Sequence, residues 1–471
     1  MSRPPSQSSQ YDRSIVEGPI GPAVWKLAWP TMLQNVIGGL QGIVDHVMVG
    51  HYVGYVGNAA IGISWQIFLV VIVFIASMYT GMAVLVARFV GANDPDKTNR
   101  TVYQAFLTSL AIWLGVMAPV GYFFAPALLD FVNAAPEVET EALPYLRIMF
   151  VFSFGMLFFF MLGGALRSAG DARTPLRLGV IMTVLNIVLN VILIRGFGPI
   201  PGFGTMGAAM GTAIAAGIVG VVGISLLFSG QLVIRLSWAM SWRPDWSIIR
   251  SLFRFGLPTG FQGVAMNVAG VLLLRFIGSL EHSAEAQAAY AVGYTELFAL
   301  IAWTSSGLMG ATAAVAGQNL GAGHPERTVQ GVHAASRIGL AVAAAIGLVF
   351  FLVPRFLFGL FGLQDQTVLS VGSQLLRVLS VSGIFLTLAL TYTGGLQGTG
   401  DTRSPLYITL VSQIAVPLGI CFALQAMNRL DAIDIWVAIL LGHLTRCLLS
   451  IARFRQEKWR HIAVDIEPAR G

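Results

Sequence analysis

The chain contains one block of sequence twice, as ALRSAGDARTPL at residues 165–176 and as GLQGTGDTRSPL at residues 395–406. Six of the twelve positions are identical, and the copies lie 230 residues apart. A second pair, GANDPDKT at 91–98 and GAGHPERT at 321–328, has the same offset. A constant offset at separate places predicts two tandem copies of one structural unit. In each block we expect Gly to permit a turn, Asp to cap the next helix and Pro to open it.

The composition predicts a protein that crosses a membrane many times. Of 471 residues, 56% are hydrophobic and only 11% are charged, whereas a soluble protein has roughly a quarter charged residues. This balance excludes a soluble enzyme, a nucleic-acid-binding module and a disordered chain. The apolar runs are continuous and do not alternate every second residue, so we expect helices and not a β-barrel.

Twelve apolar stretches are long enough to cross a bilayer, since each span needs about 20 residues. They lie at residues 24–50, 59–87, 101–126, 143–166, 174–195, 205–231, 250–278, 287–316, 333–353, 372–396, 405–427 and 433–452. We therefore predict an all-α membrane protein with twelve transmembrane helices in two pseudo-symmetric six-helix lobes. The predicted parts are an N-terminal tail (1–23), an N-lobe (24–231), a linker (232–249), a C-lobe (250–455) and a C-terminal tail (456–471). Six spans per copy predict a symmetry axis along the membrane normal and a cavity at the interface between the lobes.

The positive charges predict the orientation. With the N-terminus inside, 22 of the 28 Lys and Arg residues fall on the inner side, which the positive-inside rule places in the cytoplasm. We expect a multi-pass protein of the plasma membrane, the inner membrane of a bacterial cell, with both termini cytoplasmic. His443 and Arg446 would then lie near the inner end of the last span, at the interface.

The linker carries Trp238, Trp242 and Trp246 at a spacing of four, mixed with Arg235 and Arg243. Tryptophan and arginine together are typical of a segment anchored at the membrane interface. A lipid sensor is the alternative.

Further motifs carry a family resemblance. They are VDHVMVG at 44–50, LNIVLNVILI at 185–194 and AGQNLGAGHPER at 316–327, besides the paired blocks. With these the chain resembles the multidrug and toxic compound extrusion (MATE) transporters. The resemblance implies a V-shaped pair of six-helix lobes that exports organic, often cationic, compounds in exchange for Na⁺ or H⁺.

Asp45 is the central candidate residue. A carboxylate within a span costs at least ~2.5 kcal/mol to insert, so it should face a cavity or a partner. Asn186 and Asn190 lie four residues apart on one helical face at the same depth, and Thr212 lies at that level in the next span. These oxygens form a candidate cation-binding site, although each amide or hydroxyl alone is commonly a helix-packing contact.

The resemblance implies that Asp45, with a proline fifteen residues earlier, is the coupling carboxylate. In one branch of the family the position of Asn190 is Asp, and that Asp joins the site. Because one negative charge is missing here, H⁺ coupling is favoured over Na⁺, with no other cofactor expected.

Four further polar residues are candidates for the substrate cavity: Gln34, Gln66, Gln262 and Glu296. Glu296 matches Gln66 at an offset of 230 residues. It could attract cationic substrates or carry a proton, or it could instead pair with Arg275. His46 points about 100° away from Asp45 around the helix, which favours packing over a role in proton transfer.

Pro30 and Pro258 each remove a backbone hydrogen bond in the first span of a lobe. Each gives either a simple kink or a hinge, which for Pro30 would be coupled to the state of Asp45.

The sequence has no HExxH, GxSxG or P-loop motif and no metal-spaced Cys/His cluster, so we expect no enzyme and no ATP-driven pump. The predicted function is secondary antiport of small organic compounds, cationic or amphipathic and drug-like, in exchange for H⁺ or Na⁺, by a monomer in the lipid bilayer that binds no nucleic acid. The alternative is a lipid-linked precursor flippase of the related larger superfamily. A membrane enzyme or receptor is disfavoured.

Overall fold

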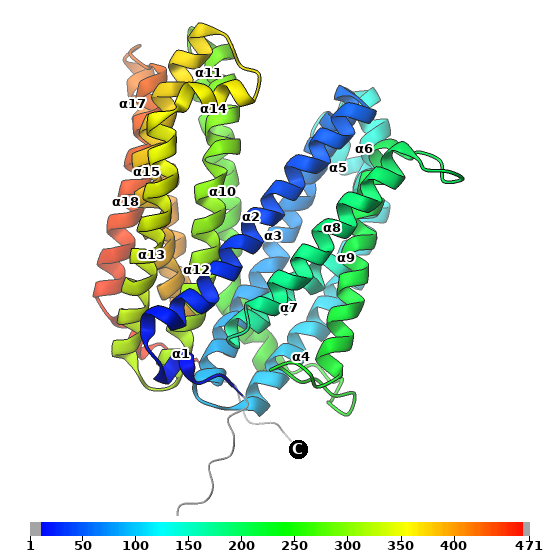
Figure 1. Ribbon diagram of the computed structural model, residues 1–471, viewed down its shortest axis with the longest axis vertical. Coiled ribbons are helices and arrows are strands. Elements are labelled where there is room, and N and C mark those ends of the chain that lie inside the picture. Colours follow the sequence, from blue (N-terminus) through cyan, green and yellow to red (C-terminus); the bar gives the residue numbers. More distant parts are fainter. Residues whose placement is uncertain (1–10, 465–471) are drawn as a thin grey trace, which may run out of the picture. The chain divides into compact units, whose positions relative to one another are not determined.

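All twelve apolar stretches form helices in the computed structural model, which describes residues 11–464. The ends of the two predicted tails, residues 1–10 and 465–471, lie outside the described part. Within residues 11–464 the chain forms no strand, and its one isolated bridge joins Phe197 to Ile200. The all-helical prediction is therefore confirmed (Figure 1).

The first half of the chain forms helices with short connections. Their bounds are α1 Ser14–Glu17, α2 Ile20–Tyr52, α3 Tyr55–Gly91, α4 Pro95–Ile112, the π-helical turns η1 Trp113–Met117 and η2 Val120–Phe124, α5 Ala125–Phe131, α6 Pro136–Val151, α7 Phe154–Ser168, α8 Arg173–Arg195 and α9 Gly204–Phe228. Helices α4 to α5 form one continuous apolar segment, and α6 and α7 are bent by 48° relative to each other at the break between them.

The second half repeats this order with its own interruptions. Its elements are α10 Trp246–Ile277, α11 Ser283–Tyr290, the π-helix η3 Ala291–Leu297, α12 Ala299–Gly321, α13 Pro325–Leu352, α14 Pro354–Leu360, α15 Gln366–Gly398, α16 Arg403–Thr409, the π-helix η4 Leu410–Ala415, α17 Val416–Ala426, α18 Ala432–Arg455 and the 3₁₀ turn η5 Lys458–His461. The short helix α14, which follows α13, was not predicted from the apolar pattern.

Within residues 11–464, ten helices are long and apolar enough to cross a membrane, and the count is eleven if the bent pair α6–α7 is one span. The twelfth expected span, α2, has 33 residues but is not among them. The reason lies in its polar side chains, which include Gln34, Asn35, Gln41 and Asp45. The least apolar span is thus the one that carries the predicted functional carboxylate.

The repeated blocks form the same turn twice. The glycine before each Asp has a left-handed φ, 99° in the first copy and 98° in the second, which a residue without Cβ adopts without strain. Asp171 accepts a hydrogen bond from Thr174 N at 3.0 Å, and Asp401 accepts one from Ser404 N at 3.2 Å. Each Asp therefore accepts from the first turn of the next helix, as expected, but it stands one residue before the N-cap, which is Ala172 in α8 and Thr402 in α16.

The chain divides into two compact units whose borders differ from the predicted lobes. Among described residues, unit 1 contains 11–12 and 36–257, and unit 2 contains 13–35 and 258–464. The first part of α2 therefore belongs to unit 2, and the first part of α10 belongs to unit 1. The sequence repeat does not indicate this exchange, because it compares each copy with the other and says nothing about which copy a segment packs against.

Unit 1 is built around α3, which packs against α4, α6, α7 and α9, while α8 packs along α9. The exchanged start of α10 lies against α3 without intervening side chains. A Cβ on Gly81 would stand 2.0 Å from the carbonyl oxygen of Leu252, and one on Gly256 would stand 2.4 Å from that of Ser77. Glycine at these places allows the close backbone approach.

Unit 2 is built around α15, which packs against α11 to α14, α16 and α18. The exchanged start of α2 lies against α12, because a Cβ on Gly307 would stand 2.6 Å from the Met32 backbone. Asn35 Nδ2 also donates to the Trp303 carbonyl at 3.3 Å. The two exchanged segments thus pack on equivalent helices, α3 and α12, of the opposite repeat.

Candidate functional site

The predicted cation site lies in unit 1, on α2, α8 and α9. Asp45 stands seven residues before the end of α2, Asn190 five residues before the end of α8, and Thr212 eight residues after the start of α9. At 1.5 Å per residue, all three residues lie about 8–12 Å from a helix terminus, which is the end of α2 and of α8 and the start of α9. Because α8 and α9 pack along each other, their side chains meet at this level.

A chain of hydrogen bonds joins the predicted residues. Asn190 Nδ2 donates to Asp45 Oδ1 at 2.7 Å and to Asn186 Oδ1 at 3.4 Å. Asn186 Nδ2 donates in turn to Thr212 Oγ1 at 3.0 Å. Both Asn side chains are fully buried. The structure therefore brings together the four residues that depth along the helices had selected.

Three residues of this hydrogen-bond chain have oxygen atoms that can still bind a proton or a cation. Asp45 is half-buried and forms no ion pair with any residue of 11–464, and only its Oδ1 takes part in a hydrogen bond. The buried Oδ1 of Asn190 has no hydrogen-bond partner among the described residues. Thr212 is half-buried and keeps a lone pair. Such oxygens suit a proton on the carboxylate or a hard cation.

A close contact fixes the Asn190 amide in place. A Cβ on Gly211 of α9 would lie 2.1 Å from Asn190 Oδ1, so any larger residue there would displace the amide. The absence of a side chain at Gly211 is thus what lets Asn190 approach α9 and reach Asp45.

Three further residues of this region, Thr183, Gln41 and Tyr145, were not predicted from the sequence. Thr183 Oγ1 donates to Gln41 Oε1 at 2.8 Å, which ties α8 to α2 one turn before Asp45. Tyr145 of α6 is buried and interacts electrostatically with Asp45. Gln41 could have been found, since it lies four residues before Asp45 on one helical face. Tyr145 has no such signal, because it reaches the site only through the packing of α6.

A small cavity lies beside the site. It has a volume of about 10 Å³ and is lined by Thr212, Ser153 and apolar side chains of α3, α6, α7 and α9. This is near the smallest space that holds one water molecule. Thr212 therefore lies between the hydrogen-bond chain and a pocket of water size.

Gln66 and His46, which we expected near the site, lie outside the hydrogen-bond chain. Gln66 of α3 is exposed and forms no hydrogen bond with any described residue, so the structure does not join it to Asp45. His46 is exposed and its Nδ1 lies 3.3 Å from Asn58 Oδ1. The expected divergence of His46 from Asp45 is seen.

The candidate residues of unit 2 do not form a matching site. Gln262 of α10 is 8% exposed, donates to Thr409 Oγ1 at 3.0 Å and accepts from Gln397 at 3.4 Å. Gln34, on the exchanged part of α2, is half-buried. Gln262 thus connects three helices of its own unit in this structure.

Glu296 is half-buried in the π-helix η3. No ion pair joins it to Arg275, which is exposed on α10, or to another cation of residues 11–464. The pairing alternative is therefore not seen among the described residues, where Arg275 is exposed on α10. Wide π-helical turns are frequent at functional sites.

Pro30 and Pro258 lie inside continuous helices, as the sequence indicates. Thr31 donates its hydroxyl to the carbonyls of Leu27 and Ala28, beside the bond that Pro30 removes. The unit border falls directly before Pro258 in α10 and five residues after Pro30 in α2.

The interfacial position expected for His443 and Arg446 is wrong. They are 1% and 3% exposed inside unit 2, where His443 Nδ1 lies 2.6 Å from Ser382 Oγ and Phe298 stacks on its ring. Both residues lie on the face of α18 that packs against α15, and burial follows from that face.

Comparison with known proteins places this chain in a family. The MatE family model matches residues 30–192 and 258–423, one match in each repeat. A probable multidrug resistance protein NorM of Thermotoga maritima is 27% identical over 441 residues, 93% of each chain. The multidrug resistance protein MdtK of Pectobacterium atrosepticum is 26% identical and covers 91% of this chain and 94% of its own.

Solved structures show the same fold. A multidrug resistance MATE family transporter in an outward-facing conformation has a TM-score of 0.87 at 20% identity, covering 97% of this chain and 98% of that one. A MATE protein solved in complex with MaL6 also has a TM-score of 0.87, at 21% identity, covering 96% and 98%. The fold is that of twelve membrane-spanning helices in two lobes. Since the family match extends over both repeats, the chain belongs to the MatE family of membrane transporters and is not an enzyme.

Proposed function

We propose that this protein exports organic, drug-like compounds across the plasma membrane in exchange for an ion, with both termini in the cytoplasm. The observation that carries the proposal is the chain Asp45–Asn190–Asn186–Thr212, which presents one unpaired carboxylate within a membrane-spanning unit. Its multidrug resistance relatives support organic compounds as the substrate class.

The site suits an ion that binds and is released during transport. Asp45 has no cationic partner among residues 11–464, so a proton or Na⁺ is the charge that it would take up. The Asn190 amide now donates to Asp45 Oδ1, which fits an ionised carboxylate. Protonation of Asp45 at Oδ2 would leave Oδ1 able to accept from the amide, but the uncharged carboxyl would accept this hydrogen bond more weakly than the carboxylate does. The ion would thereby change a contact between α2 and α8.

A single carboxylate favours H⁺ as the coupling ion. A hard monovalent cation is bound more strongly as the number of charged ligands rises, and here the second position is Asn190 instead of Asp. A proton, in contrast, needs only one carboxylate, because protonated Asp45 is a neutral carboxylic acid. We therefore propose H⁺ antiport, with Na⁺ as the competing ion.

Reconstituted vesicles test this proposal. The purified protein is placed in liposomes, either a pH gradient or an Na⁺ gradient is imposed, and uptake of a fluorescent organic cation is followed. We expect accumulation driven by the pH gradient and its loss when an ionophore collapses that gradient. Accumulation with the Na⁺ gradient alone would replace H⁺ by Na⁺, and equal flux without any gradient would contradict antiport.

A further inference from the structure

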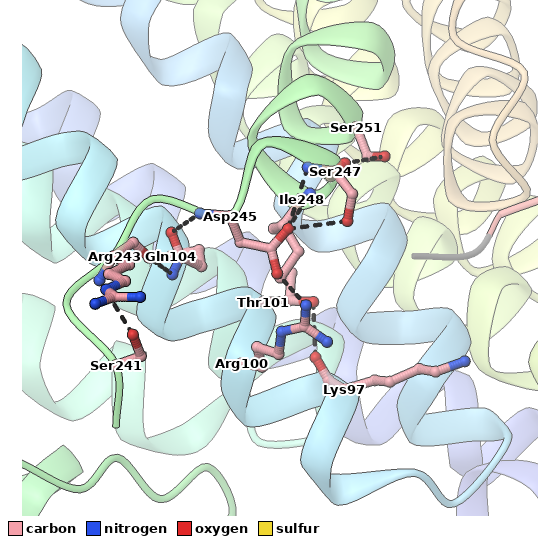
Figure 2. A network of polar contacts seen from close by, with 10 residues as sticks. All are labelled: Lys97, Arg100, Thr101, Gln104, Ser241, Arg243, Asp245, Ser247, Ile248 and Ser251. Carbon is pink, nitrogen blue, oxygen red and sulfur yellow. Dashed lines mark hydrogen bonds and ion pairs between the residues drawn. The ribbon is translucent and has the colours of Figure 1, made fainter. Parts of the chain in front are cut away.

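The linker that joins α9 to α10 is fastened to the start of α4 (Figure 2). Gln104 Nε2 donates to the Arg243 carbonyl at 2.9 Å, and Gln104 Oε1 accepts from Asp245 N at 3.1 Å. Arg100 forms an ion pair with the Asp245 carboxylate, which also accepts from backbone N–H groups in the first turn of α10. The linker therefore has a defined place on unit 1.

Three tryptophan rings of this fastened segment remain exposed. Trp238, Trp242 and Trp246 are 63%, 54% and 73% exposed. Trp238 stacks on Phe228 at a centroid distance of 4.0 Å, and Trp242 meets the edge of Tyr103 at 6.2 Å. Two of these rings are held against neighbouring aromatic side chains and all three stay open to the surroundings, and exposed apolar surface of this kind marks a site of interaction.

The cations beside these rings also lack a counter-charge. Arg235, Arg243 and Arg250 are exposed, and none of them forms an ion pair with a residue of 11–464. The one carboxylate of the linker, Asp245, is already paired with Arg100. We call Trp238, Trp242, Trp246 and these three arginines the linker surface. It carries three free positive charges and no free negative one.

The linker surface lies where a membrane boundary is expected. Helix α9 has 25 residues, about 37 Å of helix, which exceeds the roughly 30 Å hydrocarbon core. Its last residue, Phe228, therefore reaches the headgroup region, and Trp238 stacks directly on it. The segment is also fastened to the early turns of α4, which is the start of another span.

We propose that the linker surface binds the phosphate headgroups of anionic phospholipids, with the indole rings in the headgroup layer. Exposed indoles at the end of a span match the chemistry of that layer, whose interior is partly apolar and whose surface accepts N–H donors. Guanidinium groups bind phosphate oxygens bidentately, and basic segments beside spans attract anionic lipid. An acidic soluble protein would match the charges but not three indoles at a bilayer boundary. This proposal is independent of the transported compound and of the coupling ion.

Thermal unfolding of the full-length protein in a neutral detergent provides the test. Phosphatidylglycerol or phosphatidylcholine is added at equal concentration, at 50 mM and at 500 mM NaCl. We expect phosphatidylglycerol to raise Tm by several degrees more than phosphatidylcholine at low salt, and the difference to shrink at high salt because the charges are screened. Equal effects of the two lipids would overturn the proposal.

Matched variants locate the site. The variant R235Q/R243Q/R250Q should lose the excess effect of phosphatidylglycerol. The control R195Q/R355Q/R429Q removes three other exposed, unpaired arginines and should keep it. Retention of the excess in the linker variant would contradict the assignment. Free glycerol phosphate forms a further arm, and stabilisation by it equal to that by the lipid would assign a soluble phosphate instead.

Fluorescence provides a readout that does not depend on variant stability. In nanodiscs that contain both lipids, brominated phosphatidylglycerol should quench tryptophan emission more than brominated phosphatidylcholine does. The variant W238F/W242F/W246F should remove this excess, because the tryptophans that remain lie outside the linker surface. Equal quenching of the wild-type protein by the two brominated lipids would overturn the proposal even if the arginine variants failed to fold.

Discussion

Asn190 occupies the centre of the polar chain, since one amide group contacts both Asp45 and Asn186. Its position depends on a neighbour that has no side chain, Gly211. Residue type and depth were enough to select Asp45, Asn186, Asn190 and Thr212 from the sequence. The role of Gly211 could not be predicted, because it arises from how closely α8 approaches α9.

Gly211→Ala tests whether the Asn190 amide must stay in place. The new methyl group would lie 2.1 Å from Asn190 Oδ1, so the amide should be displaced, with a loss of about 1–3 kcal/mol of stability from overpacking. We expect a lower Tm and a severalfold lower rate of gradient-driven uptake in vesicles. Gly217→Ala is the matched control on the same helix, because a Cβ there contacts nothing within 4 Å. Identical behaviour of the two variants would contradict the role given to Asn190.

Asp245 should make the linker sensitive to acid. Burial raises the pKa of this carboxyl, but hydrogen bonds from Arg100 and Ser247 outweigh burial and leave the pKa lowered. A lowered pKa adds stability above the unfolded value of about 3.9, and that stability is lost as pH falls through the folded value. Hydrogen exchange of the amides in 232–249, corrected for intrinsic rates, should therefore accelerate below about pH 4.

The matched substitutions for this acid response are Asp245→Asn and Asp365→Asn. Asp245→Asn should make exchange in 232–249 fast at neutral pH and remove its acid dependence. Asp365 caps α15 in unit 2, so its substitution should leave the linker unchanged. An acid response that survives Asp245→Asn would contradict the role of the Arg100 ion pair.

At the scale of the element, helix positions and caps could be predicted but helix interruptions could not. The Gly-Asp turns and the Pro that follows them have local physical causes, and they appear in both repeats. The π-helices η1 to η4 carry no such local signal, so η3 around Glu296 was missed. The burial of Arg446 was missed for the same reason, because an apolar run does not show which face of α18 is covered.

The contact between α2 and α12 yields a prediction about close helix packing. A Cβ on Gly307 would stand 2.6 Å from the Met32 backbone, whereas one on Gly310 of the same helix contacts nothing within 4 Å. Backbone cannot move aside as a flexible side chain can, so Gly307→Ala should lower Tm by several degrees and Gly310→Ala should not. Equal Tm values would show that the exchanged start of α2 is not packed as described.

At the scale of the whole molecule, the sequence repeat shows two copies but not their exchange of segments. Residues 13–35 belong to unit 2, and residues 246–257 belong to unit 1. The constant offset of 230 residues predicted two six-helix lobes, which the fold confirms. The exchange depends on long-range packing, such as that of Gly307 and Gly81 against the other repeat, and no local pattern records it.

Splitting the chain tests the exchange. Fragments 1–231 and 232–471 each lack a segment that their own repeat packs against, so neither should accumulate alone in membranes. Co-expressed, they should co-purify through a tag on one fragment and regain the Tm of the intact chain within a few degrees. Either fragment reaching the stability of the intact chain by itself would contradict the described units.

The most direct test of the central claim compares accumulation with exchange in vesicles for Asp45→Asn. Exchange of labelled for unlabelled organic cation needs no ion gradient, whereas accumulation does. We predict that Asp45→Asn abolishes accumulation driven by a pH or Na⁺ gradient and retains exchange within about fivefold, a change of ~1 kcal/mol in the barrier. His46→Gln, beside it on α2 but exposed toward Asn58, should keep both activities. Full gradient-driven accumulation by Asp45→Asn would contradict ion coupling through this carboxylate.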